Sequence, residues 1–358
     1  MSRASIRRAV RNVFLFGWIT FGLFLLFEGT ASFLIFLRAL QTQREMGVRA
    51  EVAHADYDPE LGWVNRKGVR IDDFYGPDKD LVLNNQGFRD EEDFTQDVPR
   101  DTRRVICSGD SFTMGVGVGN RDTWCAMLES LSPGLQTVNM GQGGYGLGQA
   151  YLWYLRDGLE LEHDAQLLAF NRGDFLRLGV REFLGYGKPK LSVEADELRV
   201  EPARWNGPVK RWLAKNGYLF RELRSVEFLG RAARKIGIAE EVGGANERMR
   251  TWEIAEAIFE DLAERHRTRG TELVLVFLPT PWDHDVEHSL AWRELVTDYS
   301  VRTGTPLVDL IEEYQAMSED EAQALHIPGG EPGGKHLNEK GNLWVAERLT
   351  ERVAALQQ

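Results

Sequence analysis

Short apolar runs alternate with helical patterns along most of the chain, and this alternation predicts a parallel β-sheet covered by helices. Five runs have the length and composition of buried strands, at 105–107, 135–140, 166–170, 272–277 and 306–310. Apolar residues at helical spacing fall between or after them, at 122–131, 149–156, 247–268, 286–303 and from Asn338 to the end of the chain. Asp122 and Asn338 are the expected helix caps. This order of elements predicts an α/β domain over residues 101–356.

Two regions interrupt that alternation. Residues 38–100 are polar and rich in turn formers, which predicts a lead-in of irregular structure and short strands. Within it, Arg89 is followed by an acidic run that begins with Asp90, Glu91 and Glu92, and it is expected to form a surface ion pair. Residues 180–246 read as an insertion, with a hairpin over 188–202 that turns at Ala195 and short amphipathic helices over 207–238.

The amino-terminal 37 residues differ from the rest. Residues 1–12 carry four arginines and no acid, and residues 13–37 are apolar except for Glu28, a length that can cross a bilayer. A cleaved signal peptide would share these features. No clean small-x-small cleavage site ends the apolar stretch, which favours an uncleaved single-pass anchor. The excess of arginine before the stretch favours a cytoplasmic amino terminus. We therefore expect residues 1–12 in the cytoplasm, residues 13–37 in the inner membrane, and the remaining chain outside the cytoplasm, in the periplasm.

Composition narrows the class of protein further. The chain has 358 residues, 43% of them hydrophobic and 27% charged, which is typical of a globular protein. Its formal net charge of -12 argues against nucleic acid as a partner, because such proteins usually present a basic face. The two cysteines, Cys107 and Cys125, fall on a predicted strand and on the helix after it, so they form either a disulfide or two buried thiols.

The first predicted strand ends in Gly109-Asp110-Ser111, where apolar sequence gives way to polar chemistry. A serine at the carboxyl end of a parallel strand lies at the edge of the sheet where α/β proteins bind ligands. Ser111 is either a turn residue or a nucleophile. A nucleophilic serine also needs a base and hydrogen-bond donors for the oxyanion it creates.

His336 is the strongest candidate for that base among the seven histidines. It lies in a glycine-rich loop that leads into the last predicted helix, so it can present its ring at the same edge of the sheet. His163 and His266 have charged neighbours and are expected to be solvated. His284 and His288 lie among carboxylates, but their spacing matches no metal-ligand pattern, so we expect neither a metal nor a cofactor.

Four segments together resemble the ordered sequence blocks of SGNH/GDSL hydrolases. They are 109–113 around Ser111, 139–146, 171–174 and 336–341, and the segments 58–63 and 85–90 are similar to membrane-anchored bacterial members. The resemblance implies a three-layer α/β/α sandwich with a five-stranded parallel sheet, the flavodoxin-like SGNH fold. It also implies an esterase mechanism.

The resemblance assigns roles to individual residues. Ser111 matches the nucleophile, His336 the general base, and Gly144 the glycine whose N–H joins the Ser111 N–H in the oxyanion hole. The third block usually adds an asparagine donor, but Gly173 stands there and Asn171 lies two residues earlier, so either Asn171 supplies this oxyanion donor from a shifted backbone position or the donor is missing. The family usually places an aspartate three residues before the histidine, where this chain has Gly333; Glu331 or a backbone carbonyl is the alternative group to orient the ring.

These features predict a serine esterase that hydrolyses or transfers small acyl groups, such as acetyl, on envelope or secreted carbohydrate. Trp153 and Tyr145 are either core residues or platforms for the sugar. Two alternatives remain open: a catalytically silent member that binds glycan or acts as a scaffold, and a lipid-ester hydrolase at the membrane surface. No protein partner is predicted.

Overall fold

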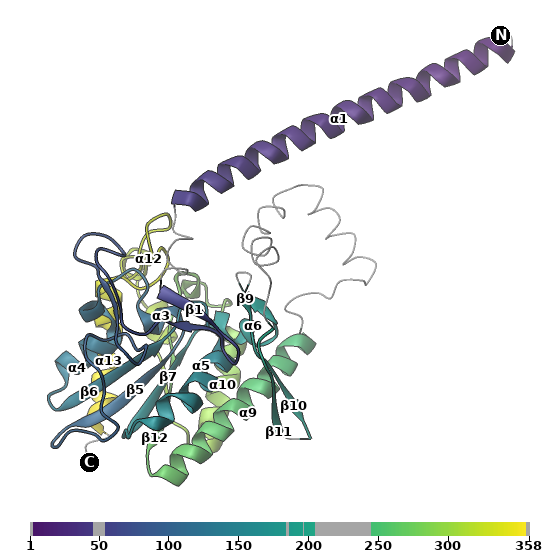
Figure 1. Cartoon of the computed structure of the whole chain (residues 1–358). Coiled ribbons are helices and arrows are strands. Elements are labelled where there is room, and N and C mark those ends of the chain that lie inside the picture. Colours follow the sequence, from purple (N-terminus) through teal and green to yellow (C-terminus); the bar gives the residue numbers. More distant parts are fainter. Residues whose placement is uncertain (1–2, 46–53, 184–185, 196, 205–244, 356–358) are drawn as a thin grey trace. The chain divides into compact units, whose positions relative to one another are not determined.

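The chain divides into two compact units, each described by itself. The computed structural model describes residues 3–45, 54–183, 186–195, 197–204 and 245–355. In the first unit it describes one long helix, α1 (Arg3–Glu45), which contains the predicted anchor 13–37 (Figure 1). Within the described ranges, α1 is the one helix long and apolar enough to cross a membrane, over Arg11–Thr30 with a mean hydropathy of 1.7. A signal sequence meets the same criteria, so this length and composition fit either role.

The second unit is built on the predicted five-stranded parallel sheet. The strand order is β13 (Leu307–Asp309), β12 (Glu272–Phe277), β7 (Ala165–Phe170), β5 (Arg103–Gly109) and β6 (Leu135–Gly141). All four neighbouring pairs are parallel. If the five strands are numbered by their order in the chain and read from β6 to β13, the order is 2-1-3-4-5, the flavodoxin-like arrangement. The chain changes direction across the sheet between β5 and β7, and ligands of such sheets bind outside the carboxyl ends of strands at that point.

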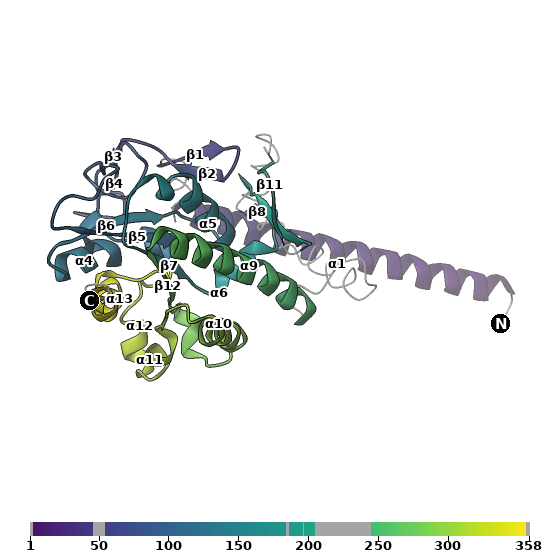
Figure 2. The same ribbon diagram turned by 90° about the horizontal axis from the view of Figure 1, so that it is seen from below.

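Helices cover both faces of the sheet, which confirms the three-layer sandwich (Figure 2). On β5, Ile106 packs into the core shared with α5 (Leu147–Arg156) and α9 (Ala245–Arg269). Its neighbours Val105 and Cys107 belong to the opposite core, shared with α4 (Trp124–Leu131) and α13 (Glu339–Ala355). Successive strand residues point to opposite faces, so a fully apolar strand is needed where both faces are covered.

The remaining helices follow β5, β7, β12 and β13 along the chain. Their bounds are α3 (Ser111–Met114), α6 (Arg172–Leu178), α10 (Leu290–Thr303), α11 (Ile311–Gln315) and α12 (Glu319–Gln323). The cap of α13 is as predicted, since the Asn338 side chain accepts from the Gly341 N–H at 3.0 Å. The cap of α4 was predicted one residue too early: the Thr123 hydroxyl accepts from the Ala126 N–H at 3.2 Å. Asp122 instead ends a short 3-10 turn.

Outside the sheet, short hairpins form the lead-in and the start of the insertion. The lead-in pairs β1 (Ala55–Asp58) with β2 (Gly62–Asn65), and β3 (Val69–Ile71) with β4 (Leu81–Leu83). The insertion pairs β8 (Glu182–Phe183) with β9 (Tyr186–Gly187), and β10 (Lys190–Glu194) with β11 (Glu197–Glu201). The last pair confirms the hairpin predicted around Ala195. The predicted helices at 207–238 lie outside the described residues.

The sequence left the state of two cysteines open and misjudged the surroundings of two histidines. Cys107 and Cys125 are both buried and both free thiols, which selects the second of the two alternatives. His163 and His266 are buried rather than solvated, and the Nε2 atom of each lies within hydrogen-bond distance of the Tyr154 hydroxyl, at 2.9 and 3.1 Å. Burial lowers the pKa of His266 to about 3, so this cluster is neutral. Charged sequence neighbours misled the prediction, because each ring contacts the Tyr154 hydroxyl in the interior.

Candidate active site

Ser111 stands on the sharp turn that joins β5 to α3. A side chain at Gly109 would lie 2.2 Å from the Thr113 hydroxyl, so the turn requires glycine there. Asp110 caps α3, and its carboxylate accepts from the Phe112 N–H at 2.8 Å. Ser111 is then the first residue of the helix, where the backbone N–H has no acceptor within the helix. The turn therefore presents both the hydroxyl and a free N–H at the edge of the sheet.

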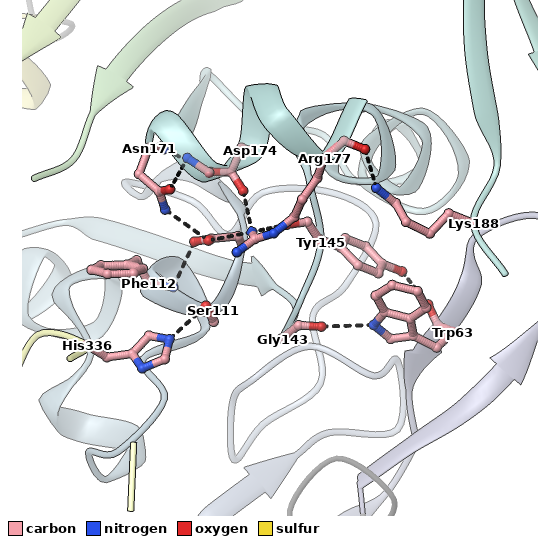
Figure 3. A network of polar contacts seen from close by, with 12 residues as sticks. Trp63, Ser111, Phe112, Gly143, Tyr145, Asn171, Asp174, Arg177, Lys188 and His336 are labelled. Carbon is pink, nitrogen blue, oxygen red and sulfur yellow. Dashed lines mark hydrogen bonds and ion pairs between the residues drawn. The ribbon is translucent and has the colours of Figure 1, made fainter. Parts of the chain in front are cut away.

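His336 meets Ser111 across 225 positions of sequence. The His336 Nε2 atom lies 2.9 Å from the Ser111 Oγ (Figure 3). The His336 Nδ1 atom lies 2.9 Å from the backbone oxygen of Gly333. Because a carbonyl oxygen only accepts, Nδ1 carries the hydrogen and Nε2 is free to accept from the serine hydroxyl. The carbonyl thus selects the tautomer that a general base requires.

The loop geometry explains why a carbonyl, rather than a carboxylate, orients the ring. Gly333 has a φ of +77°, and a Cβ there would lie 2.5 Å from the Gly117 Cα and 2.9 Å from its nitrogen. The two loops pack backbone against backbone, so no aspartate fits at position 333. Glu331 is exposed, and the position facing Nδ1 is taken by the Gly333 carbonyl. Of the two alternatives drawn from the sequence, the structure presents the carbonyl.

The second block forms a tight turn after β6. The Tyr145 N–H donates to the Gln142 carbonyl at 3.3 Å, and Gly144 has a φ of +76°, as the third residue of a type II turn requires. The lead-in holds this turn in place, since the Trp63 indole N–H donates to the Gly143 carbonyl at 2.9 Å (Figure 3). The Tyr145 hydroxyl donates to the Trp63 carbonyl at 2.6 Å. Trp63 is therefore a supporting residue that no chemical pattern in the lead-in predicted.

Asn171 follows β7 and caps α6. Its Oδ1 accepts from the Gly173 N–H at 2.7 Å, and its Nδ2 donates to the Asp110 Oδ2 at 3.0 Å. Asn171 thus reaches the residue that precedes the nucleophile, from a backbone position two residues earlier than the family pattern. One of its two amide hydrogens is used by Asp110, which leaves the second for another acceptor.

A buried ionic cluster joins the three blocks through Arg177. The Arg177 Nη1 donates to the Tyr145 carbonyl at 2.6 Å, to Asp174 at 2.8 Å and to Asp110 at 3.2 Å. Burial and the charge of Asp110 raise the pKa of Asp174 well above its ordinary value, whereas Arg177 opposes this shift. The Lys188 ammonium donates to the Arg177 carbonyl at 2.6 Å, and burial lowers its pKa to about 7. This cluster joins the turn that contains Gly144 to the residue that precedes Ser111.

Arg89 is buried, which corrects the surface ion pair predicted from its acidic neighbours. Its guanidinium donates to the carbonyls of Met114, Gly115 and Val118, in the loop that follows the nucleophile. That loop contains Gly117, against which the His336 loop packs. Sequence reasoning missed this role because backbone carbonyls brought together by folding leave no local pattern.

The structure places the His284 ring against a backbone carbonyl. The His284 ring lies 3.1 Å from the Met317 carbonyl, through its Nε2 atom. Throughout the part of the chain that the structure describes, no three His, Cys, Asp or Glu side chains converge as metal ligands would.

Burial of the His336 ring predicts where activity declines in acid. Burial is the largest influence and lowers the pKa of His336 below 6.5, against a smaller opposing effect of the Asp110 charge. Arg177 acts in the same direction as burial. A protonated His336 cannot accept the serine proton, so kcat/KM should fall through an inflection below pH 6.5 and stay level above it. A pH profile of ester hydrolysis, with thermal unfolding followed at each pH, tests this; an inflection above 6.5 would contradict it.

Comparisons with known proteins identify similar solved structures only. No family model and no curated protein matches the chain. A lipolytic protein of the G-D-S-L family from Veillonella parvula DSM 2008 is 14% identical with a TM-score of 0.37, covering 70% of this chain and 97% of its own. The acetyl xylan esterase AlAXEase is 14% identical with a TM-score of 0.39, covering 70% and 99%. The lipase/acylhydrolase from Enterococcus faecalis is 12% identical with a TM-score of 0.38, covering 71% and 96%.

Several such neighbours are G-D-S-L lipolytic proteins or acylhydrolases, the group that the sequence blocks resemble. At these identities, the evidence for a function comes from the side chains of this chain.

Proposed function

We propose that this chain is a serine esterase that cleaves small acyl esters of carbohydrate. The observation that carries the proposal is the 2.9 Å contact between the Ser111 Oγ and the His336 Nε2, with the Nδ1 hydrogen held by the Gly333 carbonyl. A serine hydroxyl hydrogen-bonded to a neutral imidazole in the correct tautomer is the arrangement that nucleophilic acyl transfer requires.

The reaction follows from these contacts. The Ser111 Oγ attacks the ester carbonyl carbon while its proton passes to the His336 Nε2, which forms a tetrahedral oxyanion. The N–H groups of Ser111 and Gly144 and the second amide hydrogen of Asn171 are the proposed donors to that oxygen. His336 then returns the proton to the departing alcohol, leaving an acyl-serine. A water molecule, or a second hydroxyl in the case of transfer, attacks the acyl-serine and regenerates the dyad.

Asp110 offers a source of negative charge for the proposed imidazolium. Its charge raises the pKa of His336, so it favours the protonated ring that forms as Ser111 attacks. The Gly333 carbonyl supplies orientation without charge. The Ser111–His336 pair is therefore expected to hold the correct tautomer of His336. Its charged ring should be stabilised less than in a triad, where a carboxylate contacts the ring directly.

The location is part of the proposal. The basic residues 1–12 and the apolar helix α1 support a single-pass inner-membrane anchor, with residues 38–358 outside the cytoplasm. Esters on envelope or secreted carbohydrate would be within reach of a domain anchored in this way.

Covalent labelling tests the proposed nucleophile directly. The full chain in detergent should hydrolyse 4-nitrophenyl acetate, and a fluorophosphonate reagent should abolish that activity by adding one phosphonyl group to the peptide that contains Ser111. Prior incubation with substrate should slow the labelling, because both compete for the same oxygen. Mass spectrometry that finds Ser111 unmodified in fully inhibited enzyme would contradict the proposal.

Chain-length preference separates the remaining alternatives. A small-acyl esterase should favour 4-nitrophenyl acetate over the decanoate, whereas a lipid-ester hydrolase should show the reverse order. A silent module should turn over neither ester above the rate without enzyme.

A further inference from the structure

Trp282 is an exposed indole at the edge of the sheet that carries the dyad. It lies in the short 3-10 helix Pro281–His284, which follows the carboxyl end of β12. Its exposed fraction is 48%. The other tryptophans that the structure describes outside α1 are buried: Trp63, Trp124, Trp153, Trp252, Trp292 and Trp344. Exposure of so large an apolar ring sets Trp282 apart and suggests a binding role.

Lys335 connects Trp282 to the catalytic base. The Lys335 ammonium lies 4.6 Å from the centre of the Trp282 ring, and His336 is the next residue in the chain. Lys335 has a φ of +74°, a left-handed conformation that side-chain-bearing residues rarely adopt. Its N–H donates to the Ile327 carbonyl at 2.8 Å, which holds the strained residue in place. Strained backbone beside a catalytic residue is a common mark of a functional constraint.

His288 supports the indole from the same short segment. The two ring planes lie 24° apart with their centres 6.2 Å apart. Burial lowers the pKa of His288, so at neutral pH its ring is uncharged and can donate or accept one hydrogen bond. An exposed indole with an ammonium over its ring and an imidazole stacked next to it offers the two kinds of contact that a sugar needs. Pyranose C–H groups pack on an aromatic face, and the hydroxyls need nearby polar groups.

The proposed mechanism places the alcohol part of the ester on this side. His336 returns its proton to the leaving alcohol oxygen, so that oxygen must lie next to the His336 Nε2. A group attached to it that extended along the His336 loop would meet Lys335 and, through the contact of its ammonium, Trp282. Tyr145 and Trp153, the aromatic candidates from the sequence, are fully buried and belong to the core.

We propose that Trp282 and Lys335 form the subsite for the pyranose ring that bears the ester, with Trp282 as the stacking platform and Lys335 as a hydroxyl-binding group. This assignment rests on the proposed esterase function, since it places the sugar by the direction in which the alcohol leaves. It makes Trp282 a residue that determines specificity rather than a catalytic residue.

The test compares sugar and aryl esters in the full chain in detergent. The substrates are 4-nitrophenyl acetate and partially O-acetylated xylo-, cello- and chito-oligosaccharides, with acetate release measured for each. Trp282→Ala should lower the ratio of kcat/KM for the best oligosaccharide to that for the aryl ester by about tenfold, mainly through KM. Trp282→Phe should retain most of the ratio because it keeps an aromatic face. Tyr57→Ala, an exposed aromatic residue of β1, is the matched control and should leave the ratio unchanged.

Binding by calorimetry separates this subsite from the reaction. The deacetylated oligosaccharides should bind the Ser111→Ala chain, and adding Trp282→Ala should weaken the best of them by about tenfold. A ratio and an affinity that change less than twofold in Trp282→Ala would overturn the subsite, as would failure of every oligosaccharide to bind. If the unmodified chain does not hydrolyse the aryl ester but still binds an oligosaccharide through Trp282, the esterase function would be refuted and the sugar subsite would stand. Activity only toward acetyl esters in phospholipid vesicles would assign Trp282 to a lipid surface and overturn the proposal.

Discussion

Replacing Ser111 with alanine should lower kcat for 4-nitrophenyl acetate by about 10⁴-fold or more, and His336→Ala should have a similar effect. In a well-studied serine protease, removing the nucleophile or the base alone lowers kcat by about 10⁶-fold. The reason is that one hydrogen bond, 2.9 Å long, joins the atom that attacks to the atom that accepts its proton. Neither group performs its step without the other. The Ser111→Ala/His336→Ala double variant should therefore be no slower than the slower single variant.

Controls distinguish lost chemistry from lost structure. Ser111→Ala removes one hydroxyl from a site that is 8% exposed, so its thermal midpoint should stay within about 2 °C of the unmodified chain. Ser130→Ala is the matched control, because the Ser130 hydroxyl donates only to the Ala126 carbonyl on the exposed face of α4. Stopped-flow and steady-state assays supply the rates. If Ser111→Ala turned over the ester as fast as Ser130→Ala, Ser111 would not be the nucleophile, and the silent glycan-binding alternative would be favoured.

Much of the fold could be predicted because its signals are local. A strand buried on both faces must be apolar throughout, so β12 was predicted with its observed bounds, Glu272–Phe277. The start of α4 was misplaced because Asp122 and Thr123 are both good caps, and local sequence does not decide between them. The contact between Ser111 and His336 was also predictable, since each residue adjoins an element that ends or begins at one edge of a parallel sheet.

The supporting residues could not be predicted in this way. Arg89 binds carbonyls of a loop about 25 to 29 positions away, and Trp63 binds a carbonyl 80 positions away. Such contacts exist only after the sheet has formed, and a carbonyl is present at every residue, so nothing in the sequence marks the partner. The group that orients His336 is also a carbonyl. The sequence left Glu331 and an unspecified backbone carbonyl as alternatives for this role, and Glu331 lies on the surface.

The Gly333 carbonyl leads to an expectation that runs against the family pattern. Gly333→Asp would restore the usual aspartate three residues before the histidine, yet it should lower activity rather than raise it. A Cβ at 333 would lie 2.5 Å from the Gly117 Cα, within backbone that cannot rotate away, and φ is +77°. The loop must then move, and His336 moves with it. A displacement of about 1 Å in such a group can reduce the rate about 100-fold.

Two further glycine variants identify the cause. Gly333→Ala should lose activity to a similar degree, because the clash comes from the Cβ and not from the carboxylate. Gly330 also has a positive φ, +113°, but no atom lies within 4 Å of a Cβ there, so Gly330→Ala measures the cost of the backbone conformation alone. We expect the thermal midpoint to fall by roughly 5 °C in both Gly333 variants, and by less in Gly330→Ala.

A gain of activity in Gly333→Asp would contradict this expectation. If the loop can open by a small shift, the new carboxylate would reach the His336 Nδ1, and Gly333→Asp would exceed the unmodified chain in kcat and shift the acid inflection to higher pH. Gly333→Ala would then remain slow, because it has the clash without the charge. Such a result would show that the carbonyl is a replaceable partner. Equal losses in both variants would show that close packing against Gly117 determines how this dyad is built.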